Sequence, residues 1–197
     1  MKYAKLIIGI VILWLMNGCC MDPICPELTN EEASWFPYSK NDTLFFSSKV
    51  SDSVLYFPIK SHGSGSAVYP SYLGGECDKY CRASSLSYSD CYFNNTEIFN
   101  STFLIDKVED EMYVVISPTS GTTADFFSSV QYFDYRKATI LDTYRINGNL
   151  LNNVYQYICY PEQEELAETY VKKGIGLVKI VFRNGQEFEL VEHIKAK

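Results

Sequence analysis

Cysteine is the residue type with the most chemistry to offer in this sequence. The chain of 197 residues has seven cysteines but only two histidines. Cys77, Cys81 and Cys91 lie close together, separated by three and nine residues. This spacing, even with His62 added, matches no common zinc pattern, and two histidines are a thin supply of nitrogen ligands. We therefore expect disulfides, at least one within this cluster, with free buried thiols and a metal site as the alternatives.

Three other motifs suggest sites but lack the context that the chemistry needs. The segment from His62 to Ser66 does not have the Gly-x-Ser-x-Gly spacing of a serine nucleophile loop, and His193 lies near the chain end. Gly174-Ile175-Gly176 lacks the third glycine of a phosphate loop and is expected to form a sharp bend. The glutamates between 162 and 168 are expected to be a solvated face. We expect no enzyme activity, no metal and no cofactor.

The first eighteen residues have the pattern of a secretory signal peptide. Lys2 and Lys5 precede an unbroken apolar run from Leu6 to Met16, and Asn17 and Gly18 follow. A positive start, a short apolar core and a small residue before the cut define such a peptide. The run is shorter than the ~20 residues that a membrane-spanning helix needs.

The residues at the end of this segment resemble the lipobox of bacterial lipoproteins. Met16-Asn17-Gly18 supply an apolar, a tolerated and a small residue before Cys19. The resemblance implies cleavage before Cys19, lipidation of Cys19, and attachment to a membrane of the cell envelope, the outer membrane being expected. The other cysteines then form an even set of disulfide candidates whose pairing the sequence leaves open: Cys20, Cys25, Cys77, Cys81, Cys91 and Cys159.

Length and charge limit the organisation and the partners of the mature chain. Removal of residues 1–18 leaves 179 residues, enough for one domain. The removed part has two lysines and no acid, so the formal net charge changes from −7 to −9. An acidic chain without a basic cluster argues against binding of nucleic acid. We expect a lipidated tether at 19–27 and a single β-rich domain at 28–197.

Alternating apolar residues predict a mostly β fold. Thr43 to Ile59 reads as a hairpin with a four-residue loop, Lys49 to Asp52, and Asn147-Gly148 as a turn. Near the end, a three-residue loop with Gly185 in the left-handed conformation would pair Ile180 with Phe188, Val178 with Leu190, and Lys179 with Glu189 on a solvated face. Only 26–36 and 162–170 look helical. The fold class expected is an antiparallel meander, a curled sheet or partial barrel, with one or two short helices.

The segment from Ser61 to Ser101 reads as a long irregular loop. It contains glycines, many serines and three cysteines, and its periodicity is weak. A loop this long within a domain is usually functional or cross-linked. Exposed aromatics on loops bind sugars or proteins, although they also pack small satellite cores. The candidate binding surface consists of Tyr69, Tyr72, Tyr80, Tyr88 and Tyr92.

Two stretches resemble small envelope lipoproteins of Bacteroidetes. The first contains Trp35-Phe36-Pro37-Tyr38 before an Asn41-Asp42 turn, and the second is Gly174-Ile175-Gly176-Leu177-Val178-Lys179. This resemblance implies a mostly β envelope protein and carries over no catalytic residue. The function expected is a membrane-anchored, non-enzymatic binding or structural component with an envelope protein or glycan as partner. The alternative is a periplasmic carrier of an apolar ligand in a curled sheet, and a hydrolase ranks third.

Overall fold

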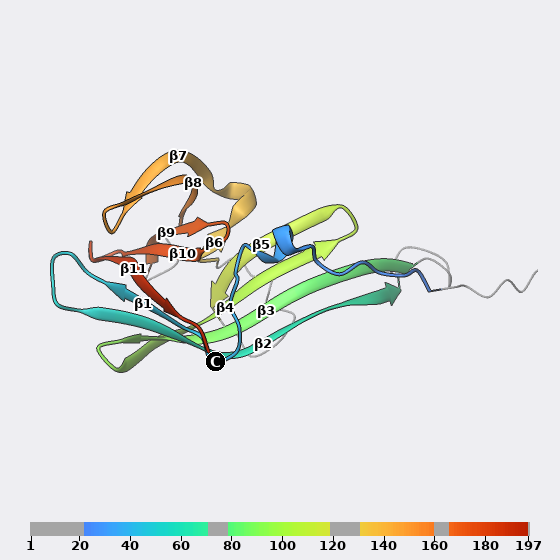
Figure 1. Ribbon diagram of the computed structural model, residues 1–197, viewed down its shortest axis with the longest axis horizontal. Coiled ribbons are helices and arrows are strands. Elements are labelled where there is room, and N and C mark those ends of the chain that lie inside the picture. Colours follow the sequence, from blue (N-terminus) through green and yellow to red (C-terminus); the bar gives the residue numbers. More distant parts are fainter. Residues whose placement is uncertain (1–21, 71–78, 119–130, 160–165, 197) are drawn as a thin grey trace, which may run out of the picture.

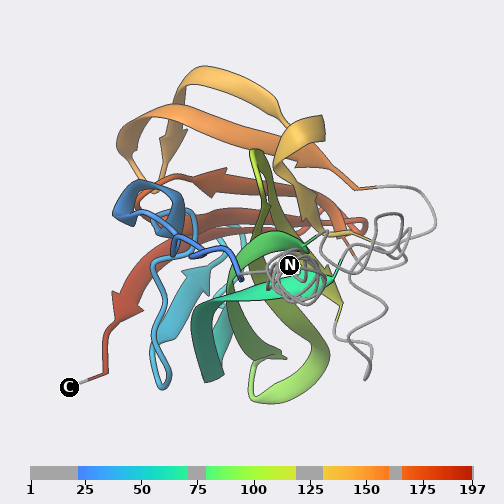
Figure 2. The ribbon, with the colours of Figure 1, turned by 90° about the vertical axis from the view of Figure 1, so that its right-hand side faces the viewer.

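The computed structural model describes residues 22–70, 79–118, 131–159 and 166–196, which form one curled antiparallel sheet of eleven strands (Figures 1 and 2). The two short helices of this part are α2 (Asn30–Ala33) and the 3-10 helix η2 (Tyr135–Lys137). The strands are β1 (Thr43–Ser47), β2 (Val54–Pro70), β3 (Lys79–Phe93), β4 (Thr96–Val108), β5 (Glu111–Pro118), β6 (Phe133–Asp134), β7 (Thr139–Ile146), β8 (Asn149–Ile158), β9 (Leu166–Lys172), β10 (Gly176–Phe182) and β11 (Glu187–Ile194).

Strands that follow one another in sequence are neighbours in the sheet, with one exception. The order is β6-β5-β4-β3-β2-β1-β11-β10-β9-β8-β7, so the first strand pairs with the last. The meander is therefore closed between β1 and β11 and open between β6 and β7. This arrangement confirms the predicted fold class. The strands β2, β3 and β4 are long and extend beyond the rest of the sheet as an arm (Figure 1).

Both predicted hairpins have the register expected from their side chains. On β1 and β2, Leu44 pairs with Phe57 and Phe46 with Leu55, which confirms the four-residue loop Lys49 to Asp52. On β10 and β11, Ile180 pairs with Phe188 and Lys179 with Glu189. Gly185 has a φ of +84°, as the predicted three-residue turn requires.

The solvated face predicted for the last hairpin is wrong. Lys179 and Glu189 are only 6% and 5% exposed. A bulge between Leu177 and Lys179 also turns Val178 away from Ile180 and into a second apolar cluster with Ile146, Val154 and Tyr170. Because the sheet curls, Ile146 of β7 and Val154 of β8 pack over the face of β10 that carries Val178, and the first five residues of β10 are buried.

The irregular loop predicted from Ser61 to Ser101 is also wrong. Within the described part, this region forms the second half of β2, all of β3 and the start of β4, in a continuous antiparallel ladder. Its small residues do alternate: Ala83, Ser85, Ser87 and Ser89 of β3 are buried, while the residues between them are largely half-buried. Because small residues such as serine occupy both the buried and the half-buried positions, the sequence shows little difference in polarity between the two faces, and the strand cannot be recognised from this difference.

Aromatic side chains fill the concave side of the sheet. The main cluster of buried residues includes Phe46, Phe57, Phe103, Phe133 and Phe188. Trp35 occupies the opening between the two edges of the sheet, with ring centroids 4.6 Å from Tyr155 of β8 and 5.3 Å from Tyr135 of η2. The tryptophan therefore packs between two edges that are not paired with each other in the part of the sheet that the structure describes.

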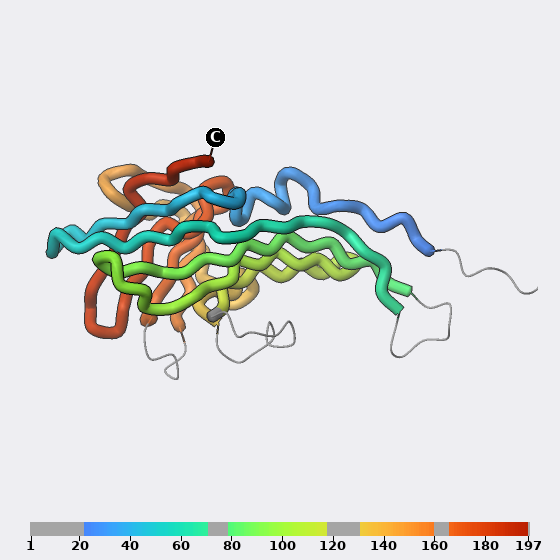
Figure 3. The backbone as a smooth tube through the Cα atoms, turned by 90° about the horizontal axis from the view of Figure 1, so that it is seen from below, coloured from blue at the N-terminus to red at the C-terminus, as the bar shows by residue number. Residues whose placement is uncertain are grey.

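The chain before β1 lies along the concave side of the arm (Figure 3). Helix α2 begins with a capping box in which Thr29 and Glu32 satisfy each other's backbone amides. It is much shorter than the helical stretch predicted at 26–36, because only one turn precedes the aromatic residues that enter the core. The second predicted helix is wrong from Leu166 to Tyr170, which belong to β9, and 162–165 lie outside the described residues.

The first described residues, predicted to belong to a tether, are fixed to the sheet. Asp22 forms an ion pair with Lys79, and Cys25 forms a disulfide with Cys81 of β3. Lys107 of β4 holds Glu32 of α2 at 2.6 Å. From Asp22 onward, the N-terminal segment is thus part of the domain.

Candidate binding surface

The second half of β2, Ser61 to Pro70, has one edge without a paired strand among the described residues. Strand β1 pairs with β2 only from Val54 to Pro58, and Asn41 and Asp42 extend the contact by two hydrogen bonds to Ile59. Beyond Ile59, the described β-pairing of β2 is with β3 alone. We call the stretch from Ser61 to Ala67 the open edge. Six of its seven residues, Ser61 to Gly65 and Ala67, are exposed. Ser66 is half-buried, and its hydroxyl donates a hydrogen bond to the carbonyl oxygen of Cys25 at 3.2 Å.

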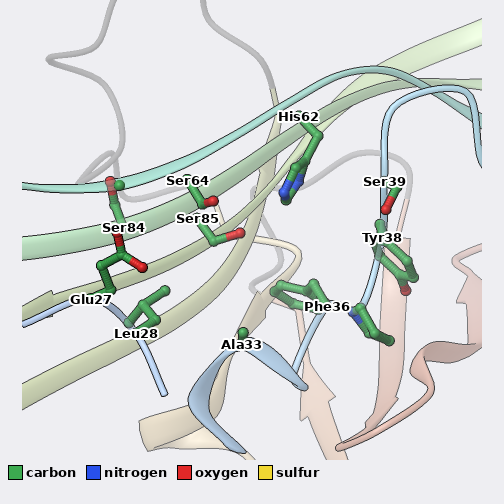
Figure 4. Close-up of a pocket in the computed structure, with 12 residues that line it drawn as sticks. Glu27, Leu28, Ala33, Phe36, Tyr38, Ser39, His62, Ser64, Ser84 and Ser85 are labelled. Carbon is green, nitrogen blue, oxygen red and sulfur yellow. The ribbon is translucent and has the colours of Figure 1, made fainter. Parts of the chain in front are cut away.

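A polar groove lies on the concave side of the open edge (Figure 4). It has a volume of about 360 Å³ and separates β2 and β3 from the N-terminal segment. The sheet contributes His62, Ser64 and Ser85, and the opposite wall contains Leu28, Phe36 and Tyr38. We call this hollow the serine groove. Its hydroxyl and imidazole groups suit hydrogen bonding to a polar side chain or to a backbone better than burial of an apolar ligand.

The histidine of the serine groove forms a hydrogen bond with a serine, but the pair lacks the features of a catalytic site. His62 Nδ1 lies 2.9 Å from Ser87 Oγ. Ser87 is only 1% exposed, so its hydroxyl is not accessible for attack on a substrate. Within the described residues, the hydrogen bonds of His62 include no carboxylate that would orient the ring as a general base. The arrangement suits binding rather than nucleophilic chemistry.

A second hollow lies on the outer, convex face of the same stretch. It has a volume of about 580 Å³ and runs over Gly63 and Gly65 of β2 and Leu86 of β3, with Tyr69 and Tyr88 among its lining residues. A Cβ atom added at either glycine would meet nothing within 4 Å. We call this hollow the tyrosine trough. The hollow exists because Gly63 and Gly65 have no side chains, while neighbouring residues such as Tyr69 and Tyr88 have large ones.

Two cations near the hollows are paired within the protein, whereas the exposed carboxylate of Glu27 lines the serine groove. Arg82, in the tyrosine trough, binds the buried carboxylate of Asp106 at 2.7 Å and lies 5.8 Å from the ring centroid of Tyr69. This hydrogen bond with Asp106 raises the pKa of Arg82. Lys60 forms an ion pair with Asp90. These two cations are already compensated, so the surface offers a partner main-chain groups, uncharged side chains and the carboxylate of Glu27.

The predicted tyrosines do not form one patch. Tyr69 and Tyr88 line the tyrosine trough, and Tyr80 stacks on Tyr69 with ring centroids 5.7 Å apart. Tyr92 stacks instead on Tyr56, at 5.0 Å, nearer the body of the sheet. Tyr72 lies outside the described residues. Since these tyrosines lie on regular strands, their side chains are held in place by cross-strand neighbours.

The cysteine predictions have mixed outcomes. The disulfide seen joins Cys25 to Cys81, so it links the N-terminal segment to the arm. Cys91 is buried on β3. Cys159 has a free thiol, and burial raises its pKa to about 12, which makes it a poor nucleophile. Cys19, Cys20 and Cys77 lie outside the described residues.

Sequence reasoning missed the serine groove and both of its walls. His62 and Ser64 alternate with Gly63 and Gly65, and Ser85 and Ser87 alternate with Ser84 and Leu86. This period of two is the signal of a strand with two different faces, and it was available in the sequence. The opposite wall, with Phe36 and Tyr38, could not be placed there without knowledge of the disulfide.

Comparison with known proteins gives no assignment. No protein-family model, curated protein or solved structure matches this chain. None of the described helices has the length and hydropathy needed to cross a membrane. The described residues also contain no group of three or more histidine, cysteine, aspartate and glutamate side chains suited to a metal ion.

Proposed function

We propose that this protein is a lipid-anchored component of a bacterial cell envelope that binds a partner protein without catalysing a reaction. The N-terminal pattern ending at Cys19 supports the anchor. The observation that carries the binding role is the open edge of β2, which has a hollow on each of its two faces. A strand that is accessible from its edge and from both faces is a typical docking element.

The anchor proposed at Cys19 would hold the arm close to the membrane. Only two residues separate Cys19 from Asp22, which is bound to Lys79 at the start of β3. Three residue steps span at most about 11 Å. The end of the arm that contains Lys79 would therefore face the lipid surface, and a partner would meet the open edge near that surface.

The alternative function, a periplasmic carrier of an apolar ligand, has less support than binding of a partner protein. A carrier needs an apolar space inside the curled sheet, but the described concave side is filled by aromatic residues such as Phe57, Phe103 and Phe133. The groove beside the open edge is lined largely by polar groups. These features favour recognition at the surface.

Mass spectrometry of the protein from its native envelope tests the anchor. The expected result is a mature chain that begins at an acylated Cys19, and loss of this species in a Cys19→Ala variant. An unacylated chain cut at another place would overturn the anchor and leave the binding role standing.

Photo-crosslinking in the same envelopes tests the binding surface. A photoreactive amino acid at Ser61, on the open edge, is expected to give one defined protein adduct. The matched control carries the same group at Ile140, an exposed residue of β7 at the far side of the sheet. Equal labelling at both positions, or no adduct at Ser61, would contradict the proposed surface.

A further inference from the structure

We propose that the open edge of β2 receives an extended segment of a partner protein as an additional strand, with large side chains of that segment in the tyrosine trough. This inference rests on the binding role proposed above and specifies how the partner is recognised. The occupant is thus an extended peptide segment. The open edge would bind its main chain through hydrogen bonds, and the two hollows would bind its alternate side chains.

The first argument comes from the main chain of the open edge. An unpaired strand edge presents a row of N–H and C=O groups that matches only another extended backbone. Cys25 contacts the end of the stretch, with its carbonyl oxygen 3.2 Å from Ser66 Oγ and its Sγ 3.4 Å from the Ala67 carbonyl oxygen. The five residues before this contact, Ser61 to Gly65, span about 17 Å, which is the length of an ordinary strand. Proteins usually protect such an edge with lysine, proline or a bulge, and here Lys60 and Pro70 lie outside the stretch.

The second argument comes from the two glycines. Gly63 and Gly65 pair with Leu86 and Ser84 of β3 and face the tyrosine trough. A strand added beside β2 would place its own alternate residues opposite these glycines, at the usual spacing of about 4.8 Å. A large side chain opposite a glycine covers the bare backbone and gains contact, an effect used to stabilise strand pairs across glycine. Aromatic or large aliphatic residues therefore fit the trough face of the added strand.

The opposite face of the same added strand would meet different chemistry. His62 and Ser64 point to the serine groove, which continues to the hydroxyl-bearing Ser85 (Figure 4). Small polar residues satisfy these groups without burying an unpaired charge. The strand that fits both faces alternates large apolar residues with small polar residues.

A second copy of this chain is a poorer occupant. A two-fold axis centred on Ser64 would pair Gly63 with Gly65 of the other copy, and one centred on Gly63 would pair Gly65 with Ser61. Either arrangement sets only glycine or serine opposite the glycines and leaves the trough empty. An axis centred on Ser66 would bring Tyr69 opposite Gly63, but Ser66 is already bound there to the carbonyl of Cys25 at 3.2 Å. The formal net charge of −7 also opposes association of identical copies.

The test uses four capped six-residue peptides and the purified protein labelled with ¹⁵N. The first peptide alternates phenylalanine with serine, and the second replaces phenylalanine with alanine. The third and fourth carry N-methyl groups on the serine amides alone or on the phenylalanine amides alone. In a strand, alternate amides face the same side, so one methylated peptide loses its bonds to β2 while the other keeps them.

The expected result is specific in position and in ranking. The first peptide shifts the amide signals of Ser61 to Ala67, and the alanine peptide binds more weakly. One methylated peptide binds like the parent and the other loses affinity on the order of tenfold or more, since several hydrogen bonds are removed. A Gly63→Val variant, whose added side chain has free space, loses affinity for the phenylalanine peptide, whereas a Thr139→Val control on β7 does not.

Other outcomes overturn the inference. If both methylated peptides bind equally at the tyrosine trough, the surface binds side chains without strand addition. In that case strand addition fails while the proposed binding role stands. If no peptide at millimolar concentration shifts the signals of the open edge, strand addition is excluded, and photo-crosslinking from Ser61 decides the binding role separately.

Discussion

His193, near the end of β11, lies 2.9 Å from the carboxylate of Asp42, 151 residues earlier in the chain, measured from Nε2 to Oδ2. Asp42 is 2% exposed and also accepts hydrogen bonds from the backbone amides of Ser39 and Ala196. One buried carboxylate thus holds the turn before β1, the last strand and the residues after it. Burial by itself raises the pKa of Asp42, but the hydrogen bonds outweigh burial and the pKa lies below its ordinary value.

The first prediction concerns the dependence of stability on pH. Because the folded-state pKa of Asp42 is lowered, its charge stabilises the fold above the unfolded-state pKa of about 3.9, and this contribution is lost as the pH falls through the folded-state value. We expect Asp42→Asn to lower the free energy of unfolding by about 2 kcal/mol at pH 7 and by much less near pH 2. Urea unfolding at both pH values measures the difference, with Asp52→Asn in the exposed β1–β2 loop as control. A difference that is independent of pH would contradict the role of the charge.

The second prediction compares two glycines of the β9–β10 turn. Gly174 and Gly176 both have positive φ, at +89° and +94°. A Cβ at Gly174 would meet nothing within 4 Å, whereas one at Gly176 would overlap the hydroxyl of Tyr38. That hydroxyl accepts a hydrogen bond from the Leu177 amide at 2.7 Å, so it is fixed in place.

We expect Gly174→Ala to cost about 1 kcal/mol, and Gly176→Ala to cost about 3 kcal/mol or more. Thermal unfolding of the two variants under the same conditions provides the measurement. Equal losses in the two variants would show that Tyr38 does not occupy the space beside Gly176.

The third prediction concerns the last hairpin. Gly185 has a φ of +84° in the turn between β10 and β11, and the space around it is open. The backbone conformation alone therefore penalises a side chain. We expect Gly185→Ala to lower the free energy of unfolding by about 1 kcal/mol, and Gly185→Asn by less, because asparagine tolerates this conformation better. Chemical denaturation tests the order of the two variants, and a loss near zero in both would reject the turn assignment.

The fourth prediction concerns the disulfide between Cys25 and Cys81. It closes a separation of 56 residues, for which the chain-entropy model gives a stabilisation of about 4 kcal/mol. We expect Cys25→Ser to lower the unfolding midpoint and to increase hydrogen exchange of residues near the serine groove, such as Ser64 and Ser85. The core around Phe57 is expected to keep its protection until global unfolding. Unchanged exchange at the groove would mean that the N-terminal segment stays in place without the disulfide, held by the ion pairs of Lys79, Lys107 and Lys173 and by its aromatic residues in the core.

Strands with a strong apolar alternation could be predicted with their register. Large apolar residues recur at every second position, as at Leu44 and Phe46 or at Phe188 and Leu190, so the β1–β2 and β10–β11 pairings follow from the pattern. The second half of β2 has no such contrast, since glycine and serine are both small and neither is strongly apolar, and its composition therefore predicts a loop. In that region the sequence indicates a strand only through the alternation of residue types at every second position, as in His62-Gly63-Ser64-Gly65.

Features that depend on tertiary curvature could not be predicted. The burial of Lys179 requires that β7 and β8 fold over β10, where Tyr144 accepts a hydrogen bond from its ammonium at 3.2 Å. The serine groove requires that Cys25 bind Cys81 rather than any other cysteine. Both are consequences of the complete sheet and not of any local window of sequence.

The pairing of β1 with β11 has a consequence for the order in which the molecule can assemble. The strands from β1 to β6 and from β7 to β11 each form ladders between neighbours in sequence, which require only short chain closures. The contact that unites the two groups joins residues about 150 positions apart, such as Thr43 and Ile194. A nascent chain that lacks Glu187 to Ile194 therefore leaves β1 paired with β2 alone and exposes its other edge, and the sheet is completed only when the final strand is present.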